Sequence, residues 1–243
     1  MDNEIKKDLA SNWFKLLQNA ICDDISKLEK NKIKFKSTTW QRSKIKDEGG
    51  GEYRIIKNGK IFEKVGVNFS KVYGKFPKKF QKNIPGANKD PRFWASGISI
   101  VMHMQNPHIP AMHFNTRYIC TTQNWFGGGM DVTPSIKDKK EEKNFHLSLK
   151  KMCNRHNKKY YKRYKEWCDK YFYLPHRSEA TAIGGKDINI PSTFPPVCKP
   201  NFVPLSYNKL NSAYLPLLIY CISLSFKVHF LLIFFSIILL NII

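Results

Sequence analysis

Two strand-like runs in the middle of the chain constrain its fold more than any other feature. Residues 93–104 and 111–121 are rich in β-branched and aromatic side chains, and the turn-rich segment 105–110 joins them. Successive side chains on a strand point to opposite faces, so each run has one apolar face and one face that carries polar groups. The pattern therefore predicts a hairpin whose apolar side is buried.

The polar faces of this hairpin carry the first candidate site residues. These residues are Ser99, His103, His113, Asn115 and Arg117. If both faces look into one cleft, the five side chains converge there. The alternative is the solvent face of an antiparallel sheet, which often carries polar residues. Two histidines, an asparagine and an arginine on adjacent strands favour a site but leave the alternative open.

A glycine-rich segment, residues 124–134, follows the second strand and is expected to form a loop. Its three consecutive glycines, 127–129, let the backbone approach something bulky. Asp131 comes two residues later, where its carboxylate can accept hydrogen bonds from N–H groups of a ligand. It can equally cap the next turn, so both interpretations stay open.

Four histidines raise the question of a metal site. They are His103, His113, His146 and His176. Imidazole suits several transition metals, but the spacing matches no compact ligand motif. Histidines in a cleft more often form hydrogen bonds or transfer protons, so no metal is predicted.

The charge balance suggests an anionic partner. Lys plus Arg total 41 against 19 Asp plus Glu, for a formal net charge of +22. Such an excess favours nucleic acid, an anionic membrane or an acidic small molecule. Only seven of the 41 are Arg, whose guanidinium group reads bases and phosphates best, and no nucleic-acid-binding motif occurs. A nucleic acid is therefore not expected as a partner.

The remaining elements follow from periodicity and turn residues. Residues 4–30 are predicted to form an amphipathic helix, and residues 139–173 a helical region with a break near residue 157. An Asn-Gly pair at 58–59 predicts a type I′ hairpin.

Six scattered cysteines indicate neither a disulfide framework nor a zinc ribbon, and favour a reducing compartment. With acids at the N-terminus and no leader, the cytoplasm is expected, and mitochondria are the alternative.

The C-terminal part of the chain has a different amino-acid composition. Residues 181–210 are Pro-rich, and residues 215–243 are almost wholly apolar. A membrane span needs about 20 apolar residues. Lys227 limits the uncharged stretch to residues 228–243, which is shorter than that. We expect residues 1–214 to form the domain and the tail to be a gene-model artefact, with membrane contact only if the tail is genuine.

Several longer segments carry a family resemblance. They are residues 94–103 (WASGISIVMH), 106–118 (NPHIPAMHFNTRY), 125–134 (WFGGGMDVTP), 164–177 (YKEWCDKYFYLPHR) and 183–185 (IGG). Together with the 59–74 hairpin, they resemble oxygen-dependent coproporphyrinogen III oxidases in the correct order, over about residues 47–185.

The resemblance implies an α+β fold in which helices flank an antiparallel sheet. It implies oxidative decarboxylation of two propionates of coproporphyrinogen III to give protoporphyrinogen IX in haem biosynthesis. It further implies molecular oxygen as the co-substrate, no metal or organic cofactor, and a homodimer if the C-terminal part is present.

The resemblance also assigns roles to particular residues. It implies that His113 and Asp131 are catalytic, His113 as proton donor and Asp131 as the acid that contacts pyrrole nitrogens. Ser99, Asn115 and Arg117 correspond to substrate-binding residues. The other three histidines fall on positions that are linked to metal in some bacterial members.

The resemblance weakens after Gly185. Residues 186–189 (KDIN) replace an aromatic pair and two acids, and the family's C-terminal strands and Gly-Gly-Arg segment are absent. The domain is therefore expected to be C-terminally incomplete. This leaves an alternative to the enzyme, an inactive truncated fragment that binds porphyrin.

Overall fold

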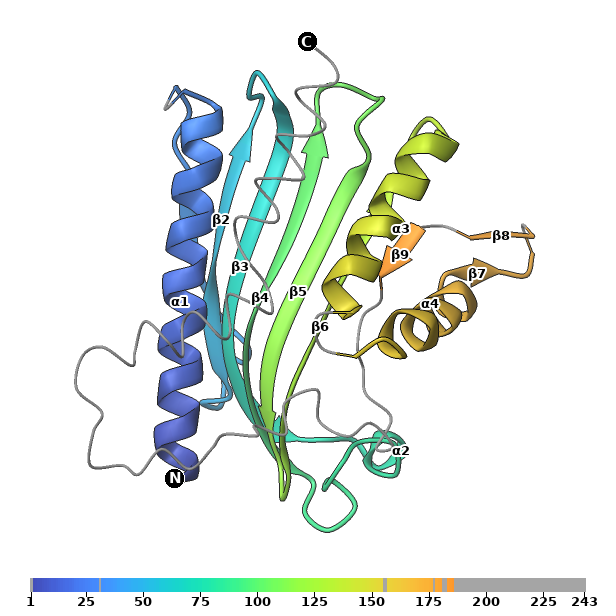
Figure 1. The fold of residues 1–243 in the computed structure, drawn as a ribbon. Coiled ribbons are helices and arrows are strands. Elements are labelled where there is room, and N and C mark those ends of the chain that lie inside the picture. The colour runs from blue at the N-terminus through green and yellow to red at the C-terminus, as the bar shows by residue number, and fades with distance from the viewer. Residues whose placement is uncertain (1, 31, 155–156, 177, 181–182, 186–243) are drawn as a thin grey trace, which may run out of the picture. The chain divides into compact units, whose positions relative to one another are not determined.

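A computed structural model describes residues 2–30, 32–154, 157–176, 178–180 and 183–185. Its centre is one seven-stranded antiparallel sheet in the order β1-β2-β3-β4-β5-β6-β9 (Figure 1). The strands of this sheet are β1 (Lys36–Gln41), β2 (Gly49–Lys57), β3 (Phe62–Lys75), β4 (Arg92–Met104), β5 (Ala111–Cys120), β6 (Asn124–Thr133) and β9 (Ile183–Gly185). The helices and the second, two-stranded sheet are α1 (Asn3–Leu28), α2 (Lys78–Gln81), α3 (Lys139–Asn154), α4 (Tyr160–Tyr171), β7 (Tyr173–Leu174) and β8 (Glu179–Ala180). The predicted α+β class is confirmed.

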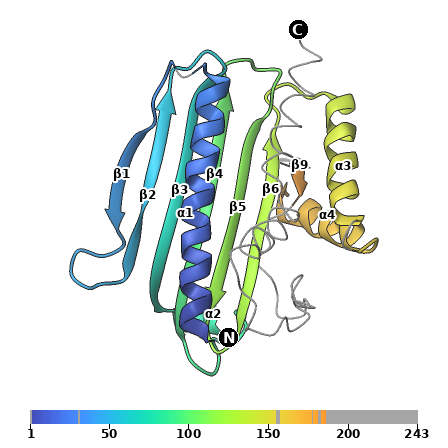
Figure 2. The same cartoon turned by 60° about the vertical axis from the view of Figure 1, so that its left-hand side comes forward.

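Helix α1 covers one face of the sheet. It runs along the middle strands, as Figure 2 shows from the side. Phe14, Leu17 and Ile21 recur at three- and four-residue steps and are buried. The helix predicted over 4–30 is confirmed, but its buried stripe also takes in Gln18, because that amide donates to the backbone oxygens of Glu52 and Val67.

The strands alternate between a face that packs on α1 and a face that points away. On β4, Ile98, Ile100 and Met102 are almost fully buried, whereas Val101 between them is 41% exposed. The predicted hairpin of β4 and β5 is confirmed, with Val101 opposite His113. The apolar core therefore lies between α1 and the sheet, and the polar side chains lie on the other face.

The β2–β3 connection differs in detail from the predicted hairpin. Asn58 has a positive φ of 58°, as a tight turn requires, but Gly59 does not. The connection spans residues 58–61, and Gly59 donates its N–H to the carbonyl oxygen of Phe62. A type I′ turn is therefore wrong, because the Glu29 carboxylate binds the backbone N–H groups of residues 60–62 and shapes a longer connection.

The loop predicted for residues 124–134 is wrong. Residues 124–133 form β6, which pairs with β5 along its whole length. Glycine is a poor strand former on its own, but here the ladder to β5 supplies the backbone hydrogen bonds.

The helical region predicted over 139–173 is confirmed as α3 and α4, with the break at Asn157. Phe145 and Leu149 of α3 and Cys168 of α4 are buried, and both helices pack against β9. In the described part of the chain, no helix is both long and apolar enough to cross a membrane. The predicted tail, residues 215–243, lies outside the described residues.

Candidate functional site

The candidate site lies on the sheet face that points away from α1. Side chains on this face come from alternate positions of β3, β4, β5 and β6. The register places Ser99 opposite Asn115, and places His113 opposite Asp131. The strand order therefore brings these four residues, which span 33 positions in sequence, onto one surface.

His113 and Asp131 form a direct pair. The Nδ1 atom of His113 lies 2.8 Å from Oδ2 of Asp131. An ionised carboxylate only accepts hydrogen bonds, so the proton of a neutral imidazole is held on Nδ1. The Asp131 side chain is 13% exposed and the His113 side chain 34% exposed. The acid is thus sheltered, while the imidazole reaches further toward solvent.

Arg117 and Asn115 form a second pair beside the first. The Nη2 atom of Arg117 donates to Oδ1 of Asn115 over 2.9 Å. Asn115 is buried at 7% exposure, so its amide oxygen is held in place and orients the guanidinium group. A planar guanidinium held in this way is well suited to bind a carboxylate through two parallel hydrogen bonds.

The glycine triplet of β6 serves the site in a different way from the one expected. Gly127 and Gly129 lie opposite Arg117 and Asn115, on the same face as Asp131. They add no side chain to this surface, so the backbone is approachable there. Gly128 points the other way, and a Cβ on it would collide with the carbonyl oxygen of Asn115. Asp131 lies inside the strand and does not cap a turn.

The polar face is therefore not a plain solvent face. Asn115 and Asp131 are largely buried, and both hydrogen-bond to a neighbouring site residue. The register places Ser99, His113, Asn115, Arg117 and Asp131 on one face of the sheet.

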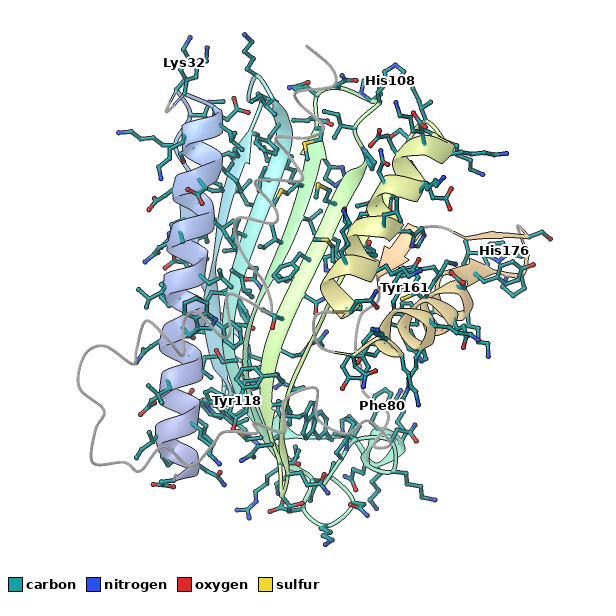
Figure 3. All side chains as sticks on the ribbon, viewed as in Figure 1. Lys32, Phe80, His108, Tyr118, Tyr161 and His176 are labelled. Carbon is teal, nitrogen blue, oxygen red and sulfur yellow. The ribbon has the colours of Figure 1, made fainter. Side chains whose placement is uncertain are left out.

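The other histidines are arranged differently. His103 is on β4, on the same face as Ser99, toward the end of the strand. His146 is on α3, and His176 lies beside β7 and β8, outside the main sheet (Figure 3). Among the described residues, no three His, Cys, Asp or Glu side chains gather as a metal site would require.

His146 has a distinct environment in the packing of α3 against α4. Its Nδ1 atom is buried without a hydrogen-bond partner, and its ring contacts that of Tyr161. Burial lowers the pKa of His146, and the positive charge of Lys165 lowers it further. This environment therefore favours the neutral form of the ring.

Strand β3 adds positions to this face that were not predicted from the sequence. Asn68 lies opposite Ser99, and Gly66 lies opposite Val101, so both belong to the same face as the site. The signal was present in the alternation of residues 64–70, where Val65 and Val67 are fully buried and their neighbours Gly66 and Asn68 are only partly buried.

Comparison with known proteins identifies the family of the chain. A family model described as coproporphyrinogen III oxidase matches residues 10–226. The chain belongs to the coproporphyrinogen III oxidase family. The matched segment extends on both sides of residues 47–185, which carry the resemblance described from the sequence. Helix α1 and its packing on the sheet are therefore part of the family's domain.

Two relatives show the extent of the similarity. The oxygen-dependent coproporphyrinogen-III oxidase of Rickettsia bellii (strain RML369-C) is 44% identical over 191 residues, which cover 75% of this chain and 67% of the relative. The protein of the same name from Rickettsia akari (strain Hartford) is 44% identical over 187 residues, covering 74% and 66%. The matched segment thus spans about two-thirds of each relative's length.

Proposed function

We propose that this protein is an oxygen-dependent coproporphyrinogen III oxidase of haem biosynthesis. The observation that carries the proposal is the His113–Asp131 pair, which lies next to the Arg117–Asn115 pair on the sheet face that points away from α1. The chain that carries these pairs belongs to this family. The substrate is a reduced tetrapyrrole with four carboxylate arms. Two of its propionates become vinyl groups, and the product is protoporphyrinogen IX.

Each decarboxylation balances with one molecule of oxygen. The propionate loses its carboxyl group as carbon dioxide, and the adjacent ring-side carbon loses a hydrogen, so that a carbon–carbon double bond forms. The departing hydrogen carries two electrons and one proton to oxygen, and one further proton taken up from solvent completes the reduction to hydrogen peroxide. The electron-rich macrocycle reacts with oxygen directly, so the proposal includes no resident metal or organic cofactor. The protein's part is to orient the substrate and exclude water.

The site residues divide these tasks between them. Arg117, steadied by Asn115, binds a propionate carboxylate, and the Ser99 hydroxyl can donate a hydrogen bond to the same arm. Asp131 uses Oδ2 for His113, which leaves Oδ1 to accept a pyrrole N–H and to stabilise positive charge on the ring. His113 transfers a proton through Nε2 while Asp131 holds its Nδ1 proton in place.

The wider setting of the proposal follows from charge and chemistry. A net charge of +22 favours encounter with a tetra-anionic substrate. Cys22, Cys120, Cys153 and Cys168 are free thiols, as expected in a reducing compartment. We include the cytoplasm and a homodimeric assembly in the proposal, with mitochondria as the alternative compartment.

A turnover assay on the full chain tests the proposal. Coproporphyrinogen III is added anaerobically, oxygen is admitted, and the porphyrins are separated after oxidation. We expect protoporphyrin to form with oxygen uptake, and Asp131→Ala to abolish it. Asp169→Ala is the matched control, because Asp169 forms an exposed ion pair with Lys165 on α4 and should leave turnover unchanged. Tight porphyrin binding without turnover by the unaltered chain would instead identify a porphyrin-binding protein.

A further inference from the structure

Gly66 on β3 lies in the same row of the sheet as the His113–Asp131 pair. The register places Gly66 opposite Val101, Val101 opposite His113, and His113 opposite Asp131. The four positions therefore cross β3, β4, β5 and β6 on the face that carries the site. Because neighbouring strands are about 4.8 Å apart, Gly66 lies roughly 10 Å from His113 along this row.

Nothing in the fold requires a glycine at this position. A Cβ added to Gly66 meets no atom of the described residues within 4 Å, whereas one added to Gly51 or Gly97 would collide with a carbonyl oxygen of the neighbouring strand. Gly66 also has no positive φ, so any residue can adopt its conformation. A glycine inside a strand lowers stability by about 0.5–1 kcal/mol relative to a residue with a side chain. Packing among the described residues therefore does not account for the open space at Gly66.

Val101 indicates what that space accommodates. It is an apolar side chain, 41% exposed, that lies between Gly66 and His113 on a central strand. Ligand sites are typically apolar surfaces with a few well-placed polar groups. Val101 supplies such an apolar surface, and the polar groups of His113 and Asp131 lie next to it in the row.

We propose that Gly66 and Val101 form the floor under the part of the tetrapyrrole that extends away from His113. Gly66 leaves room for a pyrrole ring and its propionate arm, and Val101 contacts the apolar face of the macrocycle. This inference rests on the proposed function, because it names a specificity-determining position in the same site. Any side chain at position 66 occupies the space that the substrate needs, while the fold accepts it.

A graded series at position 66 tests the proposal. Gly66→Ala and Gly66→Val are compared with Lys71→Val, which adds a β-branched side chain to the opposite face of the same strand. The stable probe is coproporphyrin III, whose affinity is measured by quenching of tryptophan fluorescence, and melting temperatures are measured in parallel. Since a single misplaced methyl or methylene group typically changes affinity by about 10- to 200-fold, we expect at least tenfold weaker binding for Gly66→Val and a smaller loss for Gly66→Ala. The melting temperatures should not fall.

The outcomes separate this proposal from the proposed function. Unchanged porphyrin affinity in Gly66→Val overturns the floor at Gly66, whether or not the unaltered chain turns over substrate. An equal loss of porphyrin affinity in Lys71→Val also overturns the floor at Gly66. If the unaltered chain binds coproporphyrin III without turnover, only the proposed function fails, and the series still decides the role of Gly66. If Gly66→Val has a lower melting temperature than the unaltered chain, the porphyrin affinity of Gly66→Ala decides the role of Gly66. Absence of any porphyrin binding overturns the floor at Gly66, and absence of turnover as well overturns the proposed function.

Discussion

The contact between Glu29 and the β2–β3 connection should be one of the largest single contributions to stability in this fold. Glu29 ends α1 and is only 3% exposed. Its Oε2 accepts the N–H of Lys60 at 2.8 Å, and its Oε1 accepts those of Ile61 and Phe62 at 2.9 and 2.8 Å. A negative charge at the C-terminal end of a helix opposes the helix dipole. Helix α1 alone therefore gains nothing from this acid, and its benefit lies in the connection that it holds.

The expected loss follows from the three hydrogen bonds. A buried or partly buried N–H left without an acceptor costs about 1–3 kcal/mol. Water can reach the N–H groups of residues 60 and 61 more easily than that of Phe62, so the losses are not fully additive. We expect Glu29→Ala to lower the free energy of unfolding by about 3–5 kcal/mol. Glu29→Gln should cost about 1–2 kcal/mol, because the amide oxygen still accepts while its NH₂ group faces the N–H of Lys60.

Urea denaturation followed by circular dichroism measures these losses. Asp24→Ala is the matched control on the same helix, because Asp24 forms only a surface ion pair with Lys27 and should change stability by less than about 0.5 kcal/mol. The m-value should stay constant, so that the midpoint reports stability alone. A loss below about 1 kcal/mol for Glu29→Ala would refute the reasoning, because the three contacts would then be replaced by water at little cost.

Three further predictions test the same contacts and the site. Gly59→Ala should destabilise the fold, and less so when combined with Glu29→Ala, because a Cβ on Gly59 collides with the Glu29 carboxylate as well as with the carbonyl oxygen of Phe62; a double-mutant cycle measures the coupling. The hydrogen bond from Lys15 lowers the pKa of Glu52 to about 2, so the unaltered chain should lose stability as the pH falls from 4.5 toward 2, and Glu52→Gln should flatten that loss in acid titrations. Arg117→Lys should raise the KM about tenfold or more with a smaller effect on kcat, because Lys cannot form the bidentate pair; equal kinetics would contradict the assigned role.

The alternation of residues along the chain was enough to predict much of the sheet. Period-two patterns assigned Ser99 to one face of β4, and His113, Asn115 and Arg117 to one face of β5, because each depends only on the local direction of side chains along a strand. The three- to four-residue period of α1 was visible for the same reason. Such local rules hold whatever the rest of the chain does.

The partners of those faces were not determined by local pattern. The glycines of residues 127–129 suggested a loop, and only pairing with β5 makes them part of β6. That pairing places Asp131 opposite His113, 18 residues away, and the pairings of β3 with β4 and of β4 with β5 place Gly66 in the same row. A register depends on hydrogen bonds between distant segments, and a slip of one residue would turn every side chain to the other face. The sequence by itself therefore determined which residues share a strand face, and the tertiary structure decided which of those faces meet to form a site.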